Sequence, residues 1–288
     1  MTDRLELTAG AARAALLPGR GAAMAGLWVG DRPVLRPAGG RPGDGPFAVS
    51  NILLAPFSNR VSRPFEWGGR RRPLPRNMAA EPCPIHGDAF QRPWSVAERG
   101  PGHARLELPA GGVGPLLYAA RLSCTLSPGG FSAELTLTSQ ADEPMPFGLG
   151  FHPWFPRNAG TRLEFSASGV WQEGEGHLPA RERPDPITPD RDFSSARALP
   201  AGWVNHGFSG WDGTVGIDQG AEAVPVTMRA SANLDTLIVY SPDESSDFFC
   251  AEPVSHPVDA FNLPGMPGLS ILDPGESMTA RMELEWTG

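Results

Sequence analysis

Cysteine is scarce in this sequence, and its spacing excludes two common uses of the residue. The 288 residues contain three cysteines, Cys83, Cys124 and Cys250. An odd number without a CxxC spacing indicates neither a disulfide framework nor a zinc ribbon. We therefore expect a protein of a reducing compartment, and the cytoplasm is the predicted location.

A basic excess and a long apolar run are also missing. The formal net charge is −8, and basic residues cluster at Arg70, Arg71 and Arg72 but are otherwise scattered, so nucleic acid is not an expected partner. No run approaches the roughly 18 apolar residues that a membrane span needs. Acidic residues and arginines interrupt residues 1–21, which argues against a secretion signal. We predict a soluble protein without a membrane partner.

Glycine and proline, by contrast, are abundant, with 35 and 32 residues. They bound many short segments of alternating apolar and polar residues, and these segments lack the 3.6-residue period of an amphipathic helix. The pattern predicts an all-β fold. Strands are expected within residues 104–109, 116–126, 131–140, 162–168, 224–231, 234–241, 247–253 and 280–286.

A large β-sandwich fits this pattern better than a small barrel. The chain length is within the range of single all-β domains, and the apolar residues of segment 131–140 are those expected where two large sheets stack. We expect one sandwich domain over residues 1–288. Segment 171–202 is rich in Pro, Arg and Asp and has no periodicity, so it is expected to wrap the surface as a long excursion.

Local motifs for metals and cofactors are missing. The sequence has no HExxH or HxH spacing, no GxSxG, no Walker loop and no GxGxxG. A metal site would have to be assembled through the fold, and we predict neither a metal nor a cofactor. The six histidines are His86, His103, His152, His177, His206 and His256.

One histidine lies in an unusual strand-like segment, FGLGFHPWF. Period-two alternation places Phe147, Leu149 and Phe151 on one face and His152 on the other, together with two glycines. Such glycines indicate the close approach of a ligand or of another backbone. Pro153 then ends the hydrogen-bond ladder because it has no N–H. His152 is therefore either a group that acts on a ligand or a hydrogen-bonded histidine beside a bulge.

Glu252, in the segment DFFCAEP, shares a face with Phe248 and Cys250 by the same alternation. Desolvation in apolar surroundings raises a carboxyl pKa, and this makes a glutamate a useful base near neutral pH. The alternative is a salt-bridged glutamate that reaches water past Pro253.

Two further segments carry candidate polar residues. In PIHGD, His86 lies in a turn-like setting, and a plain surface turn with Asp88 accepting backbone hydrogen bonds is the alternative. In PFSNR, Arg60 follows Asn59 after an apolar run and has several donors for hydroxyl groups or a carboxylate. An ordinary surface salt bridge is the alternative for Arg60.

Taken together and in order, seven segments of the chain resemble the aldose 1-epimerase (galactose mutarotase) family. Each segment alone is weak evidence for the family. The motifs Asn-Arg, His-Gly, Phe-His-Pro, and Glu-Pro followed by Asp-Ala-Phe-Asn are specific when they occur together in this order. The resemblance implies a β-supersandwich that binds a monosaccharide on a broad concave face. The segments are GRGAAMAGLWVG, ILLAPFSNRVSRPFEW, PIHGDAFQRPWSV, GLGFHPWFPR, GWDGTV, CAEPVSHPVDAFNLPG and LDPGESMTARMELEW.

The resemblance also implies roles for four residues. Glu252 matches the catalytic base of the family and His152 its general acid. His86 matches a second active-site histidine, and Arg60 matches an arginine that orients the substrate.

Further substrate contacts follow less directly from the resemblance. Asn205 stands where the family has an aspartate that holds sugar hydroxyls, and Asp212 is a candidate to replace that aspartate. Trp154 and Trp94 are candidates to pack on apolar sugar faces. Phe261 is expected to be a core aromatic.

Three functional classes remain open, and the second of them, a related carbohydrate enzyme, has two forms. A mutarotase on free aldoses is expected, because the acid, the base, the second histidine and the arginine are all present. A related enzyme, such as a hexose 6-phosphate 1-epimerase, would need basic residues near the pocket, although Arg70–Arg72 is more simply a solvated hairpin. A glycosidase would need a carboxylate facing Glu252, with Asp259 as candidate. A non-catalytic sugar-binding protein would lack the acid/base pair. We expect a monomer or a homodimer.

Overall fold

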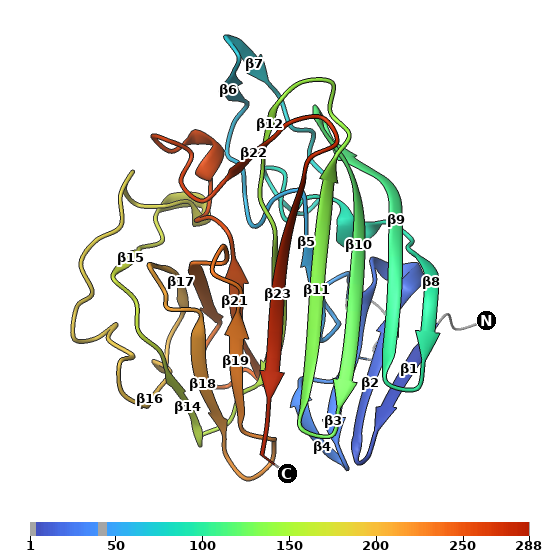
Figure 1. Ribbon diagram of the computed structural model, residues 1–288. Coiled ribbons are helices and arrows are strands. Elements are labelled where there is room, and N and C mark those ends of the chain that lie inside the picture. Colours follow the sequence, from blue (N-terminus) through green and yellow to red (C-terminus); the bar gives the residue numbers. More distant parts are fainter. Residues whose placement is uncertain (1–3, 40–44, 288) are drawn as a thin grey trace.

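The computed structural model describes residues 4–39 and 45–287, which are mostly β-structure. Two large antiparallel sheets form two layers (Figure 1). The predicted all-β sandwich is confirmed, and each segment expected to contain a strand does so. Helical structure in the described residues is limited to four short 3-10 turns, η1 (Pro18–Arg20), η2 (Ala89–Gln91), η3 (Glu175–His177) and η4 (Ala260–Asn262). No helix in this part of the chain is long and apolar enough to cross a membrane.

The first layer is a ten-stranded sheet with the order β1-β2-β3-β5-β13-β21-β20-β17-β15, and β4 pairs with β3. Its centre brings together strands that are far apart in the sequence, because β13 pairs with β5 on one side and with β21 on the other. The strands are β1 (Leu5–Ala9), β2 (Ala12–Leu17), β3 (Ala23–Val29), β4 (Arg32–Leu35), β5 (Asn51–Leu54), β13 (Gly150–Pro156), β15 (Gly169–Trp171), β17 (Val204–Ser209), β20 (Thr236–Ser241) and β21 (Phe248–Val254).

The second layer is a nine-stranded sheet with the order β16-β14-β18-β19-β23-β11-β10-β9-β8. Two small two-stranded sheets lie outside both layers: the hairpin β6–β7, and β12 paired with the distant β22. The strands of the second layer are β8 (Ser95–Gly100), β9 (His103–Val113), β10 (Leu116–Ser127), β11 (Gly130–Ser139), β14 (Thr161–Glu164), β16 (Arg197–Ala198), β18 (Thr214–Gln219), β19 (Val226–Ala230) and β23 (Ser277–Glu285). The strands of the small sheets are β6 (Phe65–Trp67), β7 (Arg70–Arg72), β12 (Met145–Phe147) and β22 (Ser270–Leu272).

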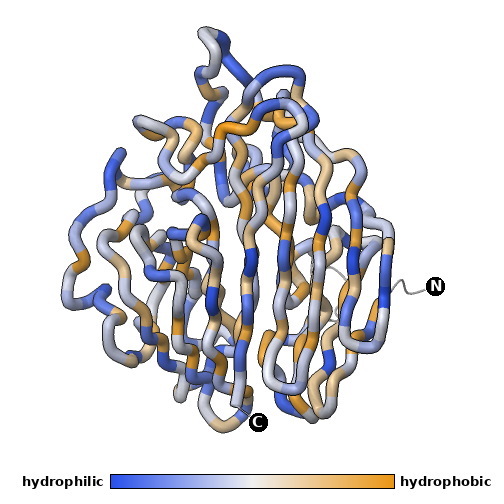
Figure 2. The backbone as a smooth tube through the Cα atoms, in the orientation of Figure 1, coloured by the Kyte–Doolittle hydropathy of each residue, from blue (hydrophilic) through white to orange (hydrophobic). Residues whose placement is uncertain are grey.

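The nine-stranded sheet has one buried face and one face toward water. Along β10 and β23 every second residue is buried, and Figure 2 shows hydrophobic and hydrophilic residues alternating along these strands. Leu122, Leu135 and Met282 point into a core that also contains Phe151 and Phe249 of the opposite sheet. Since successive side chains of a strand point to opposite faces, this core fixes the register of both layers.

The ten-stranded sheet, in contrast, is apolar on both faces near its centre. Phe151 and Phe155 of β13 belong to the core between the layers. Trp154 of the same strand belongs to a second cluster, with Ile52 of β5 and Cys250 of β21. This second cluster lies on the outer face of the sheet. By alternation, the candidate acid and base of β13 and β21 lie on that outer face too.

The excursion between β15 and β17 has little regular structure, as expected. Between Trp171 and Ala201 it contains only the three-residue η3 and the two-residue β16. The hairpin β6–β7 also agrees with the prediction for GGRRRP, because Trp67 pairs with Arg70 across a turn of two glycines. The excursion does not only cover the surface. Some of its side chains lie near the outer face of the ten-stranded sheet.

Candidate active site

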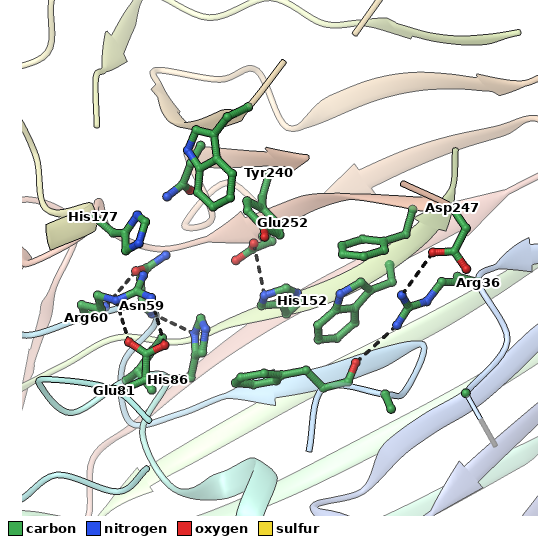
Figure 3. Close-up of a pocket in the computed structure, with 18 of the residues that line it drawn as sticks. Arg36, Asn59, Arg60, Glu81, His86, His152, His177, Tyr240, Asp247 and Glu252 are labelled. Carbon is green, nitrogen blue, oxygen red and sulfur yellow. Dashed lines mark hydrogen bonds and ion pairs between the residues drawn. The ribbon is translucent and has the colours of Figure 1, made fainter. Parts of the chain in front are cut away.

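A cavity of about 630 Å³ lies on the outer face of the ten-stranded sheet (Figure 3). Strands β13, β17, β20 and β21 supply part of its lining, and the loops after β4 and β5 supply more. The cavity brings together six of the residues expected from the sequence: Arg60, His86, His152, Trp154, Asn205 and Glu252.

His152 and Glu252 are direct cross-strand neighbours. Gly150 pairs with Val254 and Trp154 pairs with Cys250, so the register places the two candidate residues opposite each other between these pairs. The Nε2 atom of His152 lies 3.3 Å from Oε1 of Glu252, and the side chains are 9% and 3% exposed. They lie side by side in one wall of the cavity.

Burial controls the protonation of this pair. It raises the pKa of the Glu252 carboxyl to about 8, against a smaller opposing effect of Arg60. It lowers the pKa of His152 to about 3; a backbone hydrogen bond opposes this change and Arg36 adds to it. Between these values the pair holds one proton and has no net charge. Oε2 of Glu252 and Nδ1 of His152 are buried without a hydrogen-bond partner among the described residues.

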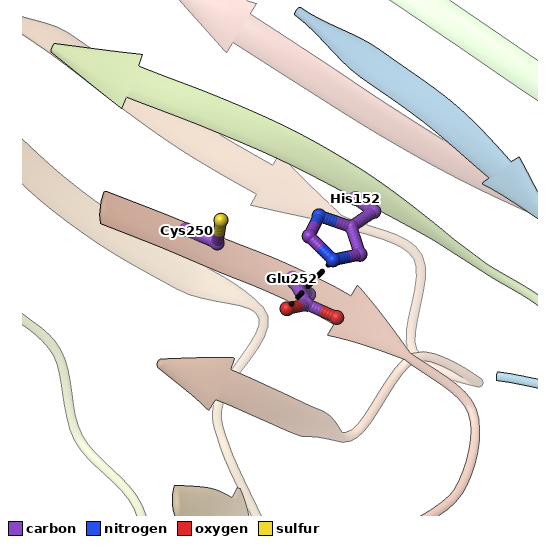
Figure 4. Close-up of side chains that lie close together, drawn as sticks. All are labelled: His152, Cys250 and Glu252. Carbon is purple, nitrogen blue, oxygen red and sulfur yellow. Dashed lines mark ion pairs between the residues drawn. The ribbon is translucent and has the colours of Figure 1, made fainter. Parts of the chain in front are cut away.

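Cys250 completes a compact group with His152 and Glu252 (Figure 4). One ligand atom from each of the three lies within 4.8 Å of the others, and His, Cys and Glu are ligand types that zinc accepts. A metal would require the Cys250 thiolate. Burial raises the pKa of this thiol well above 9, and Glu252 raises it further. Since the surroundings favour a protonated thiol, we interpret the group as an acid/base pair beside a buried cysteine.

Trp154 supports the imidazole of His152 from its own strand. The two rings stack with their centroids 4.0 Å apart and an interplanar angle of 19°. Trp154 also lines the cavity. The stacking restricts rotation of His152 and keeps Nε2 toward Glu252.

His86 presents a defined hydrogen-bond donor to the cavity. Its backbone has a φ of 60°, and the amide N–H of Asn59 donates to its Nδ1 over 3.0 Å. A neutral imidazole that accepts at Nδ1 carries its proton on Nε2. Burial lowers the pKa of His86 well below 6.5, and His152 and Arg60 lower it further. The ring is therefore neutral and offers an Nε2–H to a ligand.

Arg60 is held by a partner that sequence reasoning missed. Its Nε donates to Oε2 of Glu81 over 2.9 Å, and an Nη donates to Oε1 over 3.1 Å. The two side chains are 14% and 19% exposed and line the cavity. This bidentate pair fixes the plane of the guanidinium. The salt bridge considered for Arg60 exists, but it lies inside the pocket.

Two residues expected at the site lie elsewhere. Trp94 packs in the core between the layers, and its Nε1 donates to the carbonyl of Ala89. Asp212 is exposed in the turn between β17 and β18, where its Oδ1 accepts from the amide of Thr214. Neither lines the cavity, because the core and this turn hold their side chains away from the outer face.

Three more features considered from the sequence also lie outside the pocket. Phe261 is a core aromatic that packs against Phe57 and Phe65. Asp259 accepts from the amide and hydroxyl of Ser62 and does not line the cavity. The arginines of β7 do not line it either.

The far end of the cavity holds a second arginine that the sequence did not single out. The guanidinium of Arg36 lies 4.5 Å from the ring centroid of Phe248 and 3.8 Å from the Asp247 carboxylate. No local pattern marks Arg36, because Phe248 and Asp247 are far from it in the sequence and only the fold brings them to its guanidinium.

Fold and site together define the class of this protein: a two-layer β-sandwich with a buried histidine–glutamate pair in a cavity on the outer face of one sheet. Comparison with known proteins identifies a family with this fold. The model of the family described as aldose 1-epimerase matches residues 3–285. Accordingly, the chain belongs to the aldose 1-epimerase family.

Relatives in Escherichia coli K12 resemble the chain over almost its full length. The uncharacterized protein YphB is 33% identical over 276 residues, which cover 93% of this chain and 94% of YphB. A crystal structure provisionally described as an aldose 1-epimerase from the same organism has a TM-score of 0.91 and 31% identity, with 99% of each chain covered. A galactose mutarotase-like protein from Clostridium acetobutylicum shares the fold, with a TM-score of 0.85, 19% identity, and 98% of this chain and 94% of that chain covered.

Proposed function

We propose that this protein is an aldose 1-epimerase, or mutarotase, which interconverts the α and β anomers of a free aldose. The observation that carries the proposal is the contact of 3.3 Å between His152 and Glu252 in the wall of the pocket. Membership of the aldose 1-epimerase family supports it. In this proposal the whole chain acts as one carbohydrate-binding unit.

The reaction requires one base and one acid at the same time. Glu252 takes the proton of the C1 hydroxyl while His152 delivers a proton to the ring oxygen, so the bond from C1 to the ring oxygen breaks and C1 becomes an aldehyde. Rotation about C1–C2 presents the other face of the carbonyl, and closure returns both protons. Because the protons are returned, the reaction consumes no cofactor. A positioned proton transfer typically contributes about 10² to 10⁴ in rate.

The single proton of the pair is central to this mechanism. In the empty pocket desolvation favours a protonated Glu252 and a neutral His152. The competent form has the same number of protons but holds the proton on His152. Sugar hydroxyls that donate to Glu252 replace the hydration of the ionised carboxylate. Binding of the sugar therefore moves the proton from Glu252 to His152.

The charges of the pocket favour a neutral sugar. The chain contains no lysine, and the two arginines that line the described cavity each lie near a carboxylate, Arg60 beside Glu81 and Arg36 beside Asp247. A phosphate would require clustered, uncompensated positive charge. We therefore propose a free aldose as substrate rather than a hexose 6-phosphate.

NMR exchange spectroscopy on freshly dissolved aldoses tests the proposed function. We expect the protein to accelerate exchange between the anomeric signals of D-glucose, D-galactose or another common aldose, with buffer alone as the reference. Absence of acceleration with every common aldose would contradict the proposal.

The rate should depend on pH through the shared proton. Above about pH 8 the pair loses its only proton, so no acid remains, and kcat/KM should fall about tenfold per pH unit. On the acid side the pair gains a second proton only near pH 3. We therefore expect a flat kcat/KM between about pH 5 and 7, measured by polarimetry. A decrease centred near pH 6.5, the ordinary value of a histidine, would show that the two groups titrate independently.

A further inference from the structure

Glu173 connects three side chains that line the cavity without lining it itself. It lies just after β15, at the start of the excursion, and its side chain is 15% exposed. Its Oε1 accepts from Nδ2 of Asn205 over 2.6 Å and contacts Nδ1 of His177 at 2.5 Å. Its Oε2 accepts from Nε1 of Trp203 over 2.5 Å. Asn205, His177 and Trp203 all belong to the lining of the cavity.

The contacts keep this carboxylate ionised. Burial acts to raise the pKa of Glu173, but the hydrogen bonds from His177, Asn205 and Trp203 outweigh burial, so the pKa is lowered. An ionised carboxylate only accepts hydrogen bonds. Each of its three partners must therefore direct a donor toward Glu173.

The geometry determines which end of the Asn205 amide is available to a ligand. Nδ2 is engaged with Glu173, which leaves Oδ1 as the free acceptor of a residue that lines the cavity. A hydrogen-bond acceptor at this place suits a sugar hydroxyl that donates. The asparagine thereby offers the same kind of atom as a carboxylate, but without the charge.

The same carboxylate fixes an aromatic surface at the mouth of the cavity. Trp203 is 49% exposed, and its indole contacts the rings of Tyr240 and His177 with centroids 5.1 and 5.6 Å apart. An exposed tryptophan held by its N–H presents a rigid apolar face at low entropic cost.

We propose that Glu173 is a positioning residue for substrate recognition: it orients the Asn205 acceptor toward a sugar hydroxyl and holds Trp203 and His177 as the adjoining wall. This inference rests on the proposed function, because it assigns the wall that selects the aldose. Glu173 does not touch the reacting atoms, so its contribution is to binding and not to the proton transfers.

The first test replaces Glu173 by glutamine. Glu173→Gln keeps the size of the side chain but substitutes a donor for one acceptor, so either one partner loses its hydrogen bond or the Asn205 amide turns over and presents its donor end, instead of Oδ1, to the cavity. We expect KM for the best aldose to rise about tenfold, whereas kcat stays within about twofold. The matched control is Glu175→Gln, which removes the same charge from an exposed residue of η3. Its KM should equal that of the original protein.

The second test exchanges the two groups. Asn205→Asp alone places two carboxylates face to face and should also raise KM. In the double variant Glu173→Gln with Asn205→Asp, the amide introduced at position 173 donates to the new carboxylate and to a neutral His177, while its oxygen accepts from Trp203. We expect KM of the double variant to return to within about threefold of the original. Such recovery is non-additive, as expected for directly coupled residues, and a purely structural defect would not produce it.

Two results would overturn the inference: equal KM values for Glu173→Gln and Glu175→Gln, or a double variant as poor as the combined single variants. Failure of the proposed function is recognised separately, because the original protein would then exchange no aldose. In that case the Trp203 indole N–H signal, assigned by Trp203→Phe, still reports on the contact. It should move upfield in Glu173→Gln and recover in the double variant, and an unchanged signal would contradict the positioning role.

Discussion

Replacing Glu252 by glutamine is expected to reduce kcat for anomer exchange by about 10³-fold, because the amide cannot take the proton of the C1 hydroxyl. Glutamine has nearly the same shape, so the sugar should still bind and KM should change little. Exchange spectroscopy measures kcat, and quenching of tryptophan fluorescence by the sugar measures binding. Loss of binding together with loss of turnover would instead indicate that the carboxylate serves mainly to hold the substrate.

The same substitution should stabilise the fold. The pKa of Glu252 is raised by burial to about 8 in the folded protein, whereas an unfolded chain has the ordinary value near 4.3. The favourable contribution of the protonated carboxyl is complete below the unfolded value and is lost as the pH rises through the folded one. Glutamine carries no such penalty, so the melting temperature of Glu252→Gln should exceed that of the original by a margin that grows from pH 5 to pH 8.

A glutamate on the water-facing surface gives the matched control. Glu164 lies exposed at the end of β14, and Glu164→Gln removes the same charge without affecting the pocket. It should leave kcat unchanged and show no such pH-dependent gain in melting temperature. Residual turnover of Glu252→Gln above about one tenth of the original would exclude Glu252 as the base.

The fold could be predicted from the sequence because alternation along strands is a local signal. In FGLGFHPWF the alternation correctly separates Phe147, Leu149 and Phe151, which are in the core between the layers, from His152, which faces the cavity. The same rule places Glu252 on the outer face of β21. The alternation along a strand predicts the face on which a side chain lies. Only the register of β13 with β21 brings His152 and Glu252 together.

The remaining parts of the site depend on contacts that no local pattern encodes. Glu81 and Glu173 are ordinary glutamates in irregular segments until the fold brings them to Arg60 and Asn205. Conversely, position within a matching segment suggested Trp94 and Asp212, but core packing holds Trp94 away from the cavity and a local turn holds Asp212 away from it. The sequence therefore predicted the two residues of the proposed acid/base pair, which the fold brings together, but not Glu81 or Glu173.

The two glycines near His152 are explained by packing within the protein. They indicated the close approach of a ligand or of another backbone, and in the structure the approaching groups belong to the protein. A Cβ on Gly148 would lie 2.2 Å from the His256 ring, and that ring is held by the amide of Ser58 and contacts the carbonyl of Pro257. A Cβ on Gly150 would lie 2.7 Å from the backbone oxygen of Pro253. Both glycines are thus required for packing around the pair.

Gly150→Ala should consequently damage both stability and catalysis. Gly150 pairs with Leu54 and Val254 at the centre of the sheet, and the group its Cβ would meet is backbone, so β13 and β21 must move apart. We expect a loss of about 3 kcal/mol in the free energy of unfolding, measured by urea denaturation. The displaced strands separate His152 from Glu252, and kcat should fall about 10- to 100-fold because catalysis is sensitive to shifts near 1 Å.

A second glycine within a strand separates this steric effect from the general effect of adding a methyl group. Gly216 in β18 has room for a Cβ, with the nearest atoms 3.8 Å away. Gly216→Ala should leave kcat unchanged and keep or slightly raise stability, since alanine lowers the entropy of the unfolded chain. Equal effects of the two substitutions would mean that the spacing of β13 and β21 does not set the contact of the acid and the base. If only Gly150→Ala loses turnover, at temperatures where this variant remains folded, then catalysis depends on the spacing of β13 and β21.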